Sequence, residues 1–411
     1  MKFSLTFAGL VGLAAASPFT EHDTSGGLMR RNGKCNWKDQ HCCAIPDKYK
    51  YTSPSDSRNY YGYGRTIYVK SGKKIQEAIK KASPGDRIIV EAGTYPEQLV
   101  IDKDGIQLEG RGAVLTKPST YKRNACTGLT QDTNKNELQA GICITGYKVQ
   151  TTDYKTEHKR VTSVKRFVKG VSVTGFSVQG FSGINIAIVG AKNTRITKNK
   201  LTDGGAYGAL TLGSVNTVFR ENTVTATSGG PTGICQDNLS DVHTVKNDVS
   251  AHGIGVCVQT NGAVIEYNKL HDNCVGIFVD SGVKDAKIVH NYIGPTPPPC
   301  GKNSLGIILG SAVGILVRDN TIEGQRGTDS AGIGILIYDD ACAATPEQPL
   351  SLACITLGGK APKSNHNIVI RNTLKNNDND ILNLSKGAGN VIKCNTCSNP
   401  ANIQAGQCKK P

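Results

Sequence analysis

Short apolar segments of strand length alternate with turn residues through most of the chain. Between Lys198 and Cys397 one phrase recurs, in which an Asn is preceded at the third position by an apolar residue or Thr and followed two residues later by Leu, Val, Ile or finally Cys. Each unit then passes through a Gly into an apolar run such as YGALTL, VGIFVD or IGILIY. Alternation of this kind predicts strands, and no unit has the apolar face of a helix.

The recurring Asn marks an internal repeat. Successive copies lie 21 to 29 residues apart, with one step of 52. Three strands of about five residues with three short turns need about 21 to 24 residues, so each unit fits one coil of a three-sided solenoid. The copies are Asn199, Asn222, Asn247, Asn268, Asn291, Asn320, Asn372 and Asn395.

These asparagines are expected to be structural. An amide can donate to the coil on one side and accept from the coil on the other, so stacked copies satisfy one another. We also expect the Asn itself to take the left-handed backbone conformation of a tight turn. The repeat therefore predicts an internal asparagine ladder and assigns no chemistry to it.

The part before the repeat predicts a cap for the solenoid. Ile75, Ala78, Ile79 and Ala82 have helical spacing, and Pro84-Gly85 ends the segment. Three short strands follow, separated by Gly and Asp turns. A short amphipathic helix here would cover the open end of the solenoid.

Together these segments carry a resemblance to a known family. The stretch IQEAI…PGDRIIVEAGTYPEQLVI…IQLEGRG and the Asn-punctuated coils resemble the right-handed parallel β-helix proteins of the pectate-lyase-like superfamily, over residues 66–400. That superfamily includes polysaccharide lyases, polygalacturonases, pectin methylesterases and alginate epimerases. The resemblance implies an all-β fold, a right-handed parallel β-helix, and an acidic polysaccharide as substrate. Of the polygalacturonase blocks only AHGIG around His252 is similar.

The ends of the chain predict a secreted, extracellular protein. Residues 1–17 have the form of a signal peptide whose apolar run is too short for a membrane anchor. We expect residues 18–31 to be a propeptide that ends at the dibasic pair Arg30-Arg31. Residues 32–65 form a Tyr-rich, disulfide-tied segment with the only Trp, and residues 66–411 form the β-helix. The 14 cysteines allow up to seven disulfides, which we favour over zinc at Cys394 and Cys397.

Charge narrows the choice of partner. The formal net charge is +15, which favours a polyanion. A disulfide-rich secreted chain without a recognition motif does not fit nucleic acid, so we expect an acidic polysaccharide or cell wall, no membrane, and a monomer. An insertion at 117–166 is rich in Lys and Arg. It either walls a binding groove or is a solvated excursion pinned by Cys126 and Cys143.

The candidate site lies in one outward column of the second strands. Counting to the fourth position after the opening Gly gives Ala187, Leu212, Asp237, Cys257, Asp280, Gly310, Tyr338 and Leu384. Asp237 and Asp280 are then two coils apart, about 10 Å between backbones. His252 enters the coil between them. We assign catalysis to Asp237, His252 and Asp280, and substrate binding to His271, Tyr338 and Asp339.

Three functions fit this set. The first is β-elimination or C5 epimerisation of a uronate polysaccharide, in which calcium could neutralise the uronate carboxylate and a Lys, Arg or His would be the base. The second is inverting hydrolysis of the polygalacturonase kind, which needs a carboxyl pair about 6.5 to 9.5 Å apart. The third is a non-catalytic wall-binding or host-interacting protein, with the aspartates and histidines serving as turn residues. Asn238 and Asn383 begin glycosylation sequons.

Overall fold

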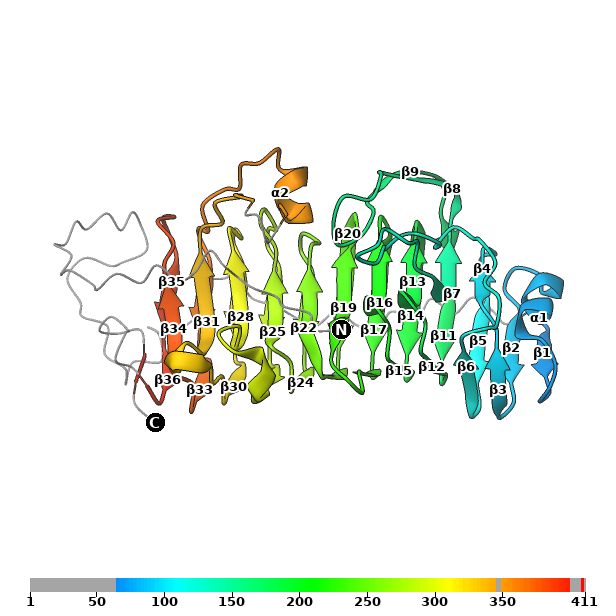
Figure 1. Ribbon diagram of the computed structural model, residues 1–411, viewed down its shortest axis with the longest axis horizontal. Helices are drawn as coiled ribbons and strands as arrows, with labels where there is room; N and C mark the ends of the chain where they lie inside the picture. Colours follow the sequence, from blue (N-terminus) through cyan, green and yellow to red (C-terminus); the bar gives the residue numbers. More distant parts are fainter. Residues whose placement is uncertain (1–63, 345–348, 400–407, 410–411) are drawn as a thin grey trace.

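The computed structural model of the chain describes residues 64–344, 349–399 and 408–409. The expected signal peptide, the expected propeptide and residues 32–63 of the Tyr-rich segment lie outside this range. Within it the chain forms a right-handed parallel β-helix, as predicted (Figure 1). No helix of the described part is both long and apolar enough to span a bilayer.

Three long parallel sheets make up the sides of the β-helix. Sheet A contains β1 (Thr66–Val69), β2 (Arg87–Val90), β5 (Gln107–Gly110), β10 (Val168–Lys169), β11 (Ser172–Thr174), β14 (Ala191–Thr197), β17 (Val215–Arg220), β20 (Ser240–Val245), β23 (Val264–Glu266), β26 (Lys287–Val289), β29 (Leu316–Arg318), β32 (Ile368–Ile370) and β35 (Val391–Lys393). Sheet B contains β3 (Gly93–Pro96), β6 (Ala113–Thr116), β12 (Ser177–Gln179), β15 (Lys200–Thr202), β18 (Thr223–Thr225), β21 (Asp248–Ser250), β24 (Lys269–His271), β27 (Tyr292–Ile293), β30 (Thr321–Glu323), β33 (Thr373–Lys375), β36 (Asn395–Cys397) and β37 (Cys408–Lys409).

Sheet C carries the residues of the candidate site. Its strands are β4 (Leu99–Ile101), β7 (Ala140–Thr145), β13 (Ile184–Val189), β16 (Tyr207–Leu212), β19 (Gly230–Asp237), β22 (His252–Val258), β25 (Val275–Val279), β28 (Leu305–Gly310), β31 (Ile333–Tyr338) and β34 (Asn379–Asn383). The other elements are the hairpin β8 (Tyr147–Thr151) and β9 (Val161–Arg166), the helices α1 (Ile75–Lys81) and α2 (Leu352–Thr356), and the 3-10 turns η2 (Pro298–Cys300) and η3 (Thr328–Ser330).

Helix α1 is the predicted cap. Ile75, Ala78 and Ile79 are buried against the first coils. The Glu97 carboxylate accepts hydrogen bonds from the backbone N–H groups of Ile75 and Gln76, at 2.9 and 3.2 Å. A carboxylate at this end satisfies otherwise unpaired N–H groups and complements the helix dipole. The helix therefore closes the apolar interior at the N-terminal end (Figure 1).

The asparagine ladder is confirmed. The Oδ1 atom of Asn247 accepts from both the backbone N and the Nδ2 of Asn222, at 3.0 and 2.9 Å, and Asn247 repeats the pattern with Asn268. The Nδ2 atom of Asn247 also donates to the carbonyl of Phe219 at 3.0 Å. Each ladder amide is thus fully used in a site closed to water.

The prediction that the ladder asparagines have left-handed backbone is wrong, because the left-handed residue is the one before each Asn. In every copy the residue before the Asn has the left-handed conformation, with φ between 54° and 56°. The Asn has its side chain turned inward to bond, while the residue before it makes the turn. These positions are Lys198, Glu221, Lys246, Tyr267, His290, Asp319, Arg371 and Cys394.

Two insertions leave the coils on the same side of the β-helix. Residues 140–145 inside the expected 117–166 insertion form β7, a strand of sheet C, so the insertion consists of two excursions. Cys126 and Cys143 are joined as expected. A second insertion follows β31 and carries α2 and the Cys342–Cys354 disulfide. The β8–β9 hairpin and α2 project from the same edge of the stacked strands (Figure 1).

Candidate functional site

The strand register brings Asp237 and Asp280 into one outward column, as expected. Gln236 pairs with Val258, and Val258 pairs with Val279. The next residues along these strands, Asp237, Gln259 and Asp280, therefore follow one another across sheet C. The two aspartates are two strands apart, which separates their backbones by about 10 Å.

The middle residue of the column differs from the expected Cys257. The sequence HGIG contains two glycines, and the glycine that matches the other coils is Gly255, because Gly233, Gly255 and Gly276 lie directly against one another. Counting from Gly253 shifts the register by two residues. In β13 the count is also two residues short, because Asn185 lies opposite Gly208 of β16, so Val189 stands in the place expected for Ala187.

Asp237 is held by two residues of the first insertion. Its carboxylate receives a bidentate pair from Arg160, with Nε–Oδ2 at 3.1 Å and Nη2–Oδ1 at 3.0 Å. The Nε2 atom of His158 lies 3.6 Å from Oδ2, and His158 Nδ1 lies 3.0 Å from the hydroxyl of Tyr207. Burial alone would raise the pKa of Asp237, but His158 and Arg160 outweigh it and hold that pKa below its ordinary value.

Asp280 has the opposite electrostatic environment. Its burial and the negative charge of Glu157 raise its pKa well above the ordinary value, with further contributions from Asp237 and Asp340. The amide of Gln259 opposes this rise and donates to the Glu157 carboxylate at 3.0 Å. The site therefore favours an ionised Asp237 beside a neutral Asp280.

A pocket of about 180 Å³ opens over these residues, between the first insertion and α2. Arg160 Nη1 donates to the Thr356 hydroxyl at 2.8 Å, and the backbone N of Leu352 donates to Glu157 at 2.9 Å. These two bonds join the insertions above sheet C. The lining includes Arg160, Asp237, Gln259, Asp280, Leu352 and Thr356.

The expected grouping of His252 with the two aspartates is wrong. His252 opens β22, whereas Gln259 follows its last residue, so about 23 Å of extended strand separates them. The imidazole is buried near Gly230 and Gly233, and burial lowers its pKa to about 4. His252 enters the right coil but at the opposite edge of sheet C.

The three expected substrate-binding residues do not line the pocket. His271 ends β24 in sheet B, with its ring nitrogens 2.9 Å from Asp248 and 2.6 Å from Asp272. Tyr338 lies in the same column as Asp280, two strands farther on, and its hydroxyl occupies the space beside Gly310.

The third of these residues, Asp339, stabilises turns. Its carboxylate accepts from the backbone N–H groups of Ser364 and Lys386, at 2.8 and 2.9 Å, and from the Ser385 hydroxyl. Burial opposes this effect, but these bonds lower the pKa of Asp339. It therefore acts as a turn cap rather than as a free ligand for substrate.

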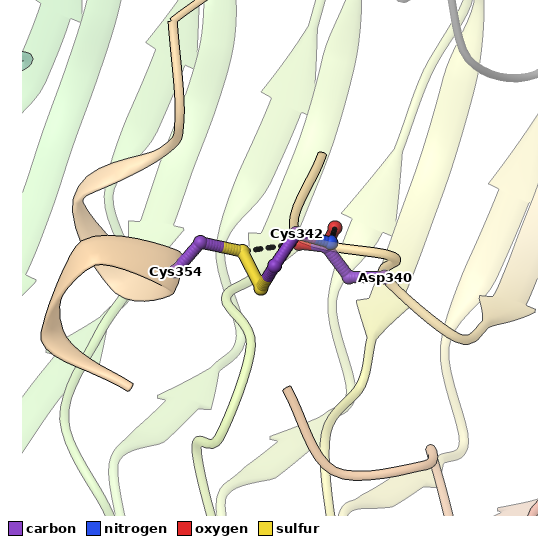
Figure 2. Close-up of side chains that lie close together, drawn as sticks. All are labelled: Asp340, Cys342 and Cys354. Carbon is purple, nitrogen blue, oxygen red and sulfur yellow. Dashed lines mark hydrogen bonds between the residues drawn. A yellow bond between two sulfur atoms is a disulfide. The ribbon is translucent and has the colours of Figure 1, made fainter. Parts of the chain in front are cut away.

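Asp340 lies beside the disulfide of the second insertion (Figure 2). Its carboxylate accepts from the backbone N of Cys342 at 2.9 Å and from the Ser281 hydroxyl at 2.7 Å, so Asp340 caps this turn. Asp340, Cys342 and Cys354 are the only three potential metal ligands of the described residues whose ligand atoms lie within 4.8 Å of one another. The disulfide removes both thiolates, so this group does not bind zinc.

Sequence reasoning missed four residues of the site. Glu157, His158 and Arg160 reach sheet C from an insertion, and no periodic pattern predicts where such a segment lands. Gln259 was missed because the column was counted from Gly253 of HGIG instead of Gly255. The one available signal was the basic character of the insertion, which supported the groove interpretation.

Comparison with known proteins supports the fold. A sequence-family profile described as a right handed beta helix region matches residues 161–293. The A-module of mannuronan C-5 epimerase AlgE4 from Azotobacter vinelandii superposes with a TM-score of 0.50 at 15% identity, covering 82% of this chain and 93% of that chain. The tailspike protein of E. coli bacteriophage HK620, solved with a pentasaccharide, gives 0.50 at 10% identity, covering 82% and 59%. No protein of curated function matches the sequence. At these identities the likeness concerns the fold.

Proposed function

We propose that this protein is a secreted enzyme that acts on an acidic polysaccharide, in the pocket between the Glu157–Arg160 segment and α2. The observation that carries the proposal is the opposite displacement of the Asp237 and Asp280 pKa values within one pocket. Carboxyl groups tuned apart in this way are suited to act as base and acid at the same pH. The net charge of +15 favours a polyanionic substrate.

The reaction that this pair suits best is hydrolysis of a glycosidic bond with inversion. Neutral Asp280 gives its proton to the leaving oxygen, and ionised Asp237 takes a proton from the water that attacks the anomeric carbon. Backbones about 10 Å apart allow the carboxyls the separation of about 6.5 to 9.5 Å that leaves room for the water. In this scheme Arg160 keeps Asp237 ionised, and His158 orients it.

Elimination or C5 epimerisation is the second candidate, and the hydrogen-bond donors of the pocket favour it. The Arg160 guanidinium and neutral Asp280 would donate to a uronate carboxylate, and ionised Asp237 would take the C5 proton. The C4–O bond then breaks in elimination, whereas in epimerisation a proton returns to the other face of C5. Calcium fits the described residues poorly, because Arg160 holds both oxygens of Asp237 and Asp280 favours its neutral form. We therefore derive no step through calcium.

One assay with three measurements distinguishes these reactions. The mature protein is incubated in D₂O with polygalacturonate, alginate or glucuronan, each with calcium or with chelator. Hydrolysis raises reducing ends alone, and elimination raises reducing ends together with near-ultraviolet absorbance. Epimerisation leaves both unchanged but introduces deuterium at C5, which proton NMR detects.

Two substitutions connect the activity to the pocket. Asp237→Asn and Asp280→Asn should each lower kcat by about 10²- to 10⁴-fold, as expected for loss of a general acid or base. Asp329→Asn is the matched control, since Asp329 is exposed in η3, before β31, whereas the second insertion leaves from the other end of that strand. Activity on none of the polymers, or full activity in both pocket variants, would reject the proposal and favour a binding protein.

A further inference from the structure

The outer face of sheet A carries an apolar patch that the proposed function does not use. In β26, β29 and β32 the central residues point into the core, and the flanking side chains point outward. Four of these outward side chains are only 0 to 5% exposed, and they form a cluster separate from the core, with Cys394 packed against it. This sheet A patch consists of Val289, Leu316, Ile368 and Ile370.

Cys394 has a disulfide partner that can be identified by elimination. It is disulfide-bonded, and no cysteine among the described residues is free. Every other described cysteine is joined to another described one. The cysteines that remain are Cys35, Cys42 and Cys43.

Geometry narrows this choice to two residues. If Cys394 bonded Cys35, then Cys42 and Cys43 would have only each other as disulfide partners. Adjacent Cα atoms are about 3.8 Å apart, which is shorter than the span of about 4.4 to 6.8 Å that disulfides prefer. Cys394 is therefore expected to pair with Cys42 or Cys43, and Cys35 with the other.

The chain is long enough for this connection. Cys394 follows β35, which lies eleven strand steps from β1 in sheet A, about 53 Å at the usual spacing. Gly64 lies at the β1 end, where its backbone N donates to Gly85 at 3.0 Å. The 21 residues from Cys43 to Gly64 span about 70 Å when extended. The segment is therefore long enough to reach from Cys394 to the first coil.

The composition of this segment suits the patch. Trp37 and five tyrosines lie between residues 32 and 63. Aromatic side chains bury large apolar areas and can keep a polar end at the surface. The patch borders Cys394, so a segment anchored there would cross it.

We propose that residues 32–63 form a strap along the outer face of sheet A, anchored at the far end by a disulfide from Cys42 or Cys43 to Cys394. The strap covers the sheet A patch and ties the first coil to the last coils. It occupies a face other than the one with the pocket, so it leaves sheet C open to a polymer. This proposal stands independently of the enzymatic one.

Tryptic mapping of the unreduced wild-type protein tests the connection. Cleavage after Lys34, Lys38, Lys48, Lys393 and Lys409 would separate Cys35, the Cys42-Cys43 pair and Cys394 onto three peptides. The strap predicts one disulfide-linked assembly of peptides 35–38, 39–48 and 394–409, which reduction dissolves. Recovery of peptide 394–409 without peptide 39–48 would overturn the proposal.

Hydrogen exchange tests whether the strap covers the patch. Cys394→Ser should speed exchange in β26, β29 and β32 and leave β19, β22 and β25 of sheet C unchanged. If that variant does not fold, reduced and oxidised wild-type protein are compared over the same strands. Equal exchange at the patch with the disulfide intact and broken would contradict the covering role.

Discussion

The corner between sheets A and B that holds the asparagine ladder, here called the ladder corner, and the pocket over sheet C are both built from buried polar residues. They arise from the sequence in different ways. At the ladder corner one Asn recurs in eight successive coils, from Asn199 to Asn395, and bonds to its own copies. At the pocket, Asp237, Gln259 and Asp280 occupy one column but differ from each other, and their partners come from insertions. Where one residue type repeats, every buried amide finds a hydrogen-bond partner. Where the column changes residue type, the Asp237 and Asp280 carboxyls are left in different electrostatic environments.

Breaking the ladder should have the largest effect on stability. Asn247→Ala removes the acceptor of two Asn222 N–H groups and the donor to the Phe219 carbonyl. Leaving buried polar groups unpaired costs about 1 to 3 kcal/mol each, so we expect a loss of about 3 kcal/mol or more in the free energy of unfolding. Denaturant unfolding measures this loss.

Asn134→Ala is the matched control for the ladder, because Asn134 lies in an exposed turn of the first insertion. Its side chain should contribute less than about 0.5 kcal/mol. Equal losses in the free energy of unfolding in the two variants would mean that the ladder amides contribute no more stability than an exposed Asn.

Asp280→Asn should change how stability depends on pH. Because the folded-state pKa of Asp280 is raised, its favourable contribution is complete below the unfolded value of about 3.9 and is lost as pH rises through the folded-state pKa. The variant should therefore gain stability relative to wild type as pH increases. Thermal unfolding over a pH series measures the difference, and a constant difference would contradict the raised pKa.

Arg160→Gln should act with the opposite sign. The pKa of Asp237 is lowered in the folded state, so its contribution is present above about 3.9 and is lost as pH falls through the folded-state value. Without the guanidinium that pKa rises, and the acid limb of the stability profile should move to higher pH. Lys302→Gln, at an exposed ion pair with Asp329, should leave the limb in place. If the acid limb of the Arg160→Gln profile stays in place, the ion pair with Arg160 does not lower the pKa of Asp237.

Glycosylation should have the smallest effect on stability. It distinguishes the buried sequon at Asn238 from the exposed sequon at Asn383. Asn238 is buried, and its Nδ2 donates to Thr217 at 3.0 Å, so this sequon should carry no glycan. Asn383 is exposed at the end of β34 and should be the modified residue. Asn383→Gln should abolish the mobility shift produced by endoglycosidase, with little change in stability. A remaining shift that Asn238→Gln removes would show that the Asn238 region is open.

The features that could be predicted are those that repeat. The phrase spacing predicted the three-sided coils and the ladder, and helical spacing at Ile75 and Ile79 predicted the cap. Asp237 and Asp280 were placed correctly relative to each other because strand register carries over from coil to coil. The coil of His252 was predicted correctly. Its position was wrong because His252 begins β22, whereas the site lies at the other end of that strand. Glu157, His158 and Arg160 escaped prediction because long-range docking of an insertion leaves no periodic signal.

The most direct test of the central claim is a crystal structure of Asp280→Asn with an oligosaccharide of whichever polymer the wild-type protein modifies. We expect an acidic sugar between the Glu157–Arg160 segment and α2, with the bond to be cleaved or the C5 atom facing Asp237 and residue 280. An oligosaccharide bound along another face, with the pocket empty, would contradict it.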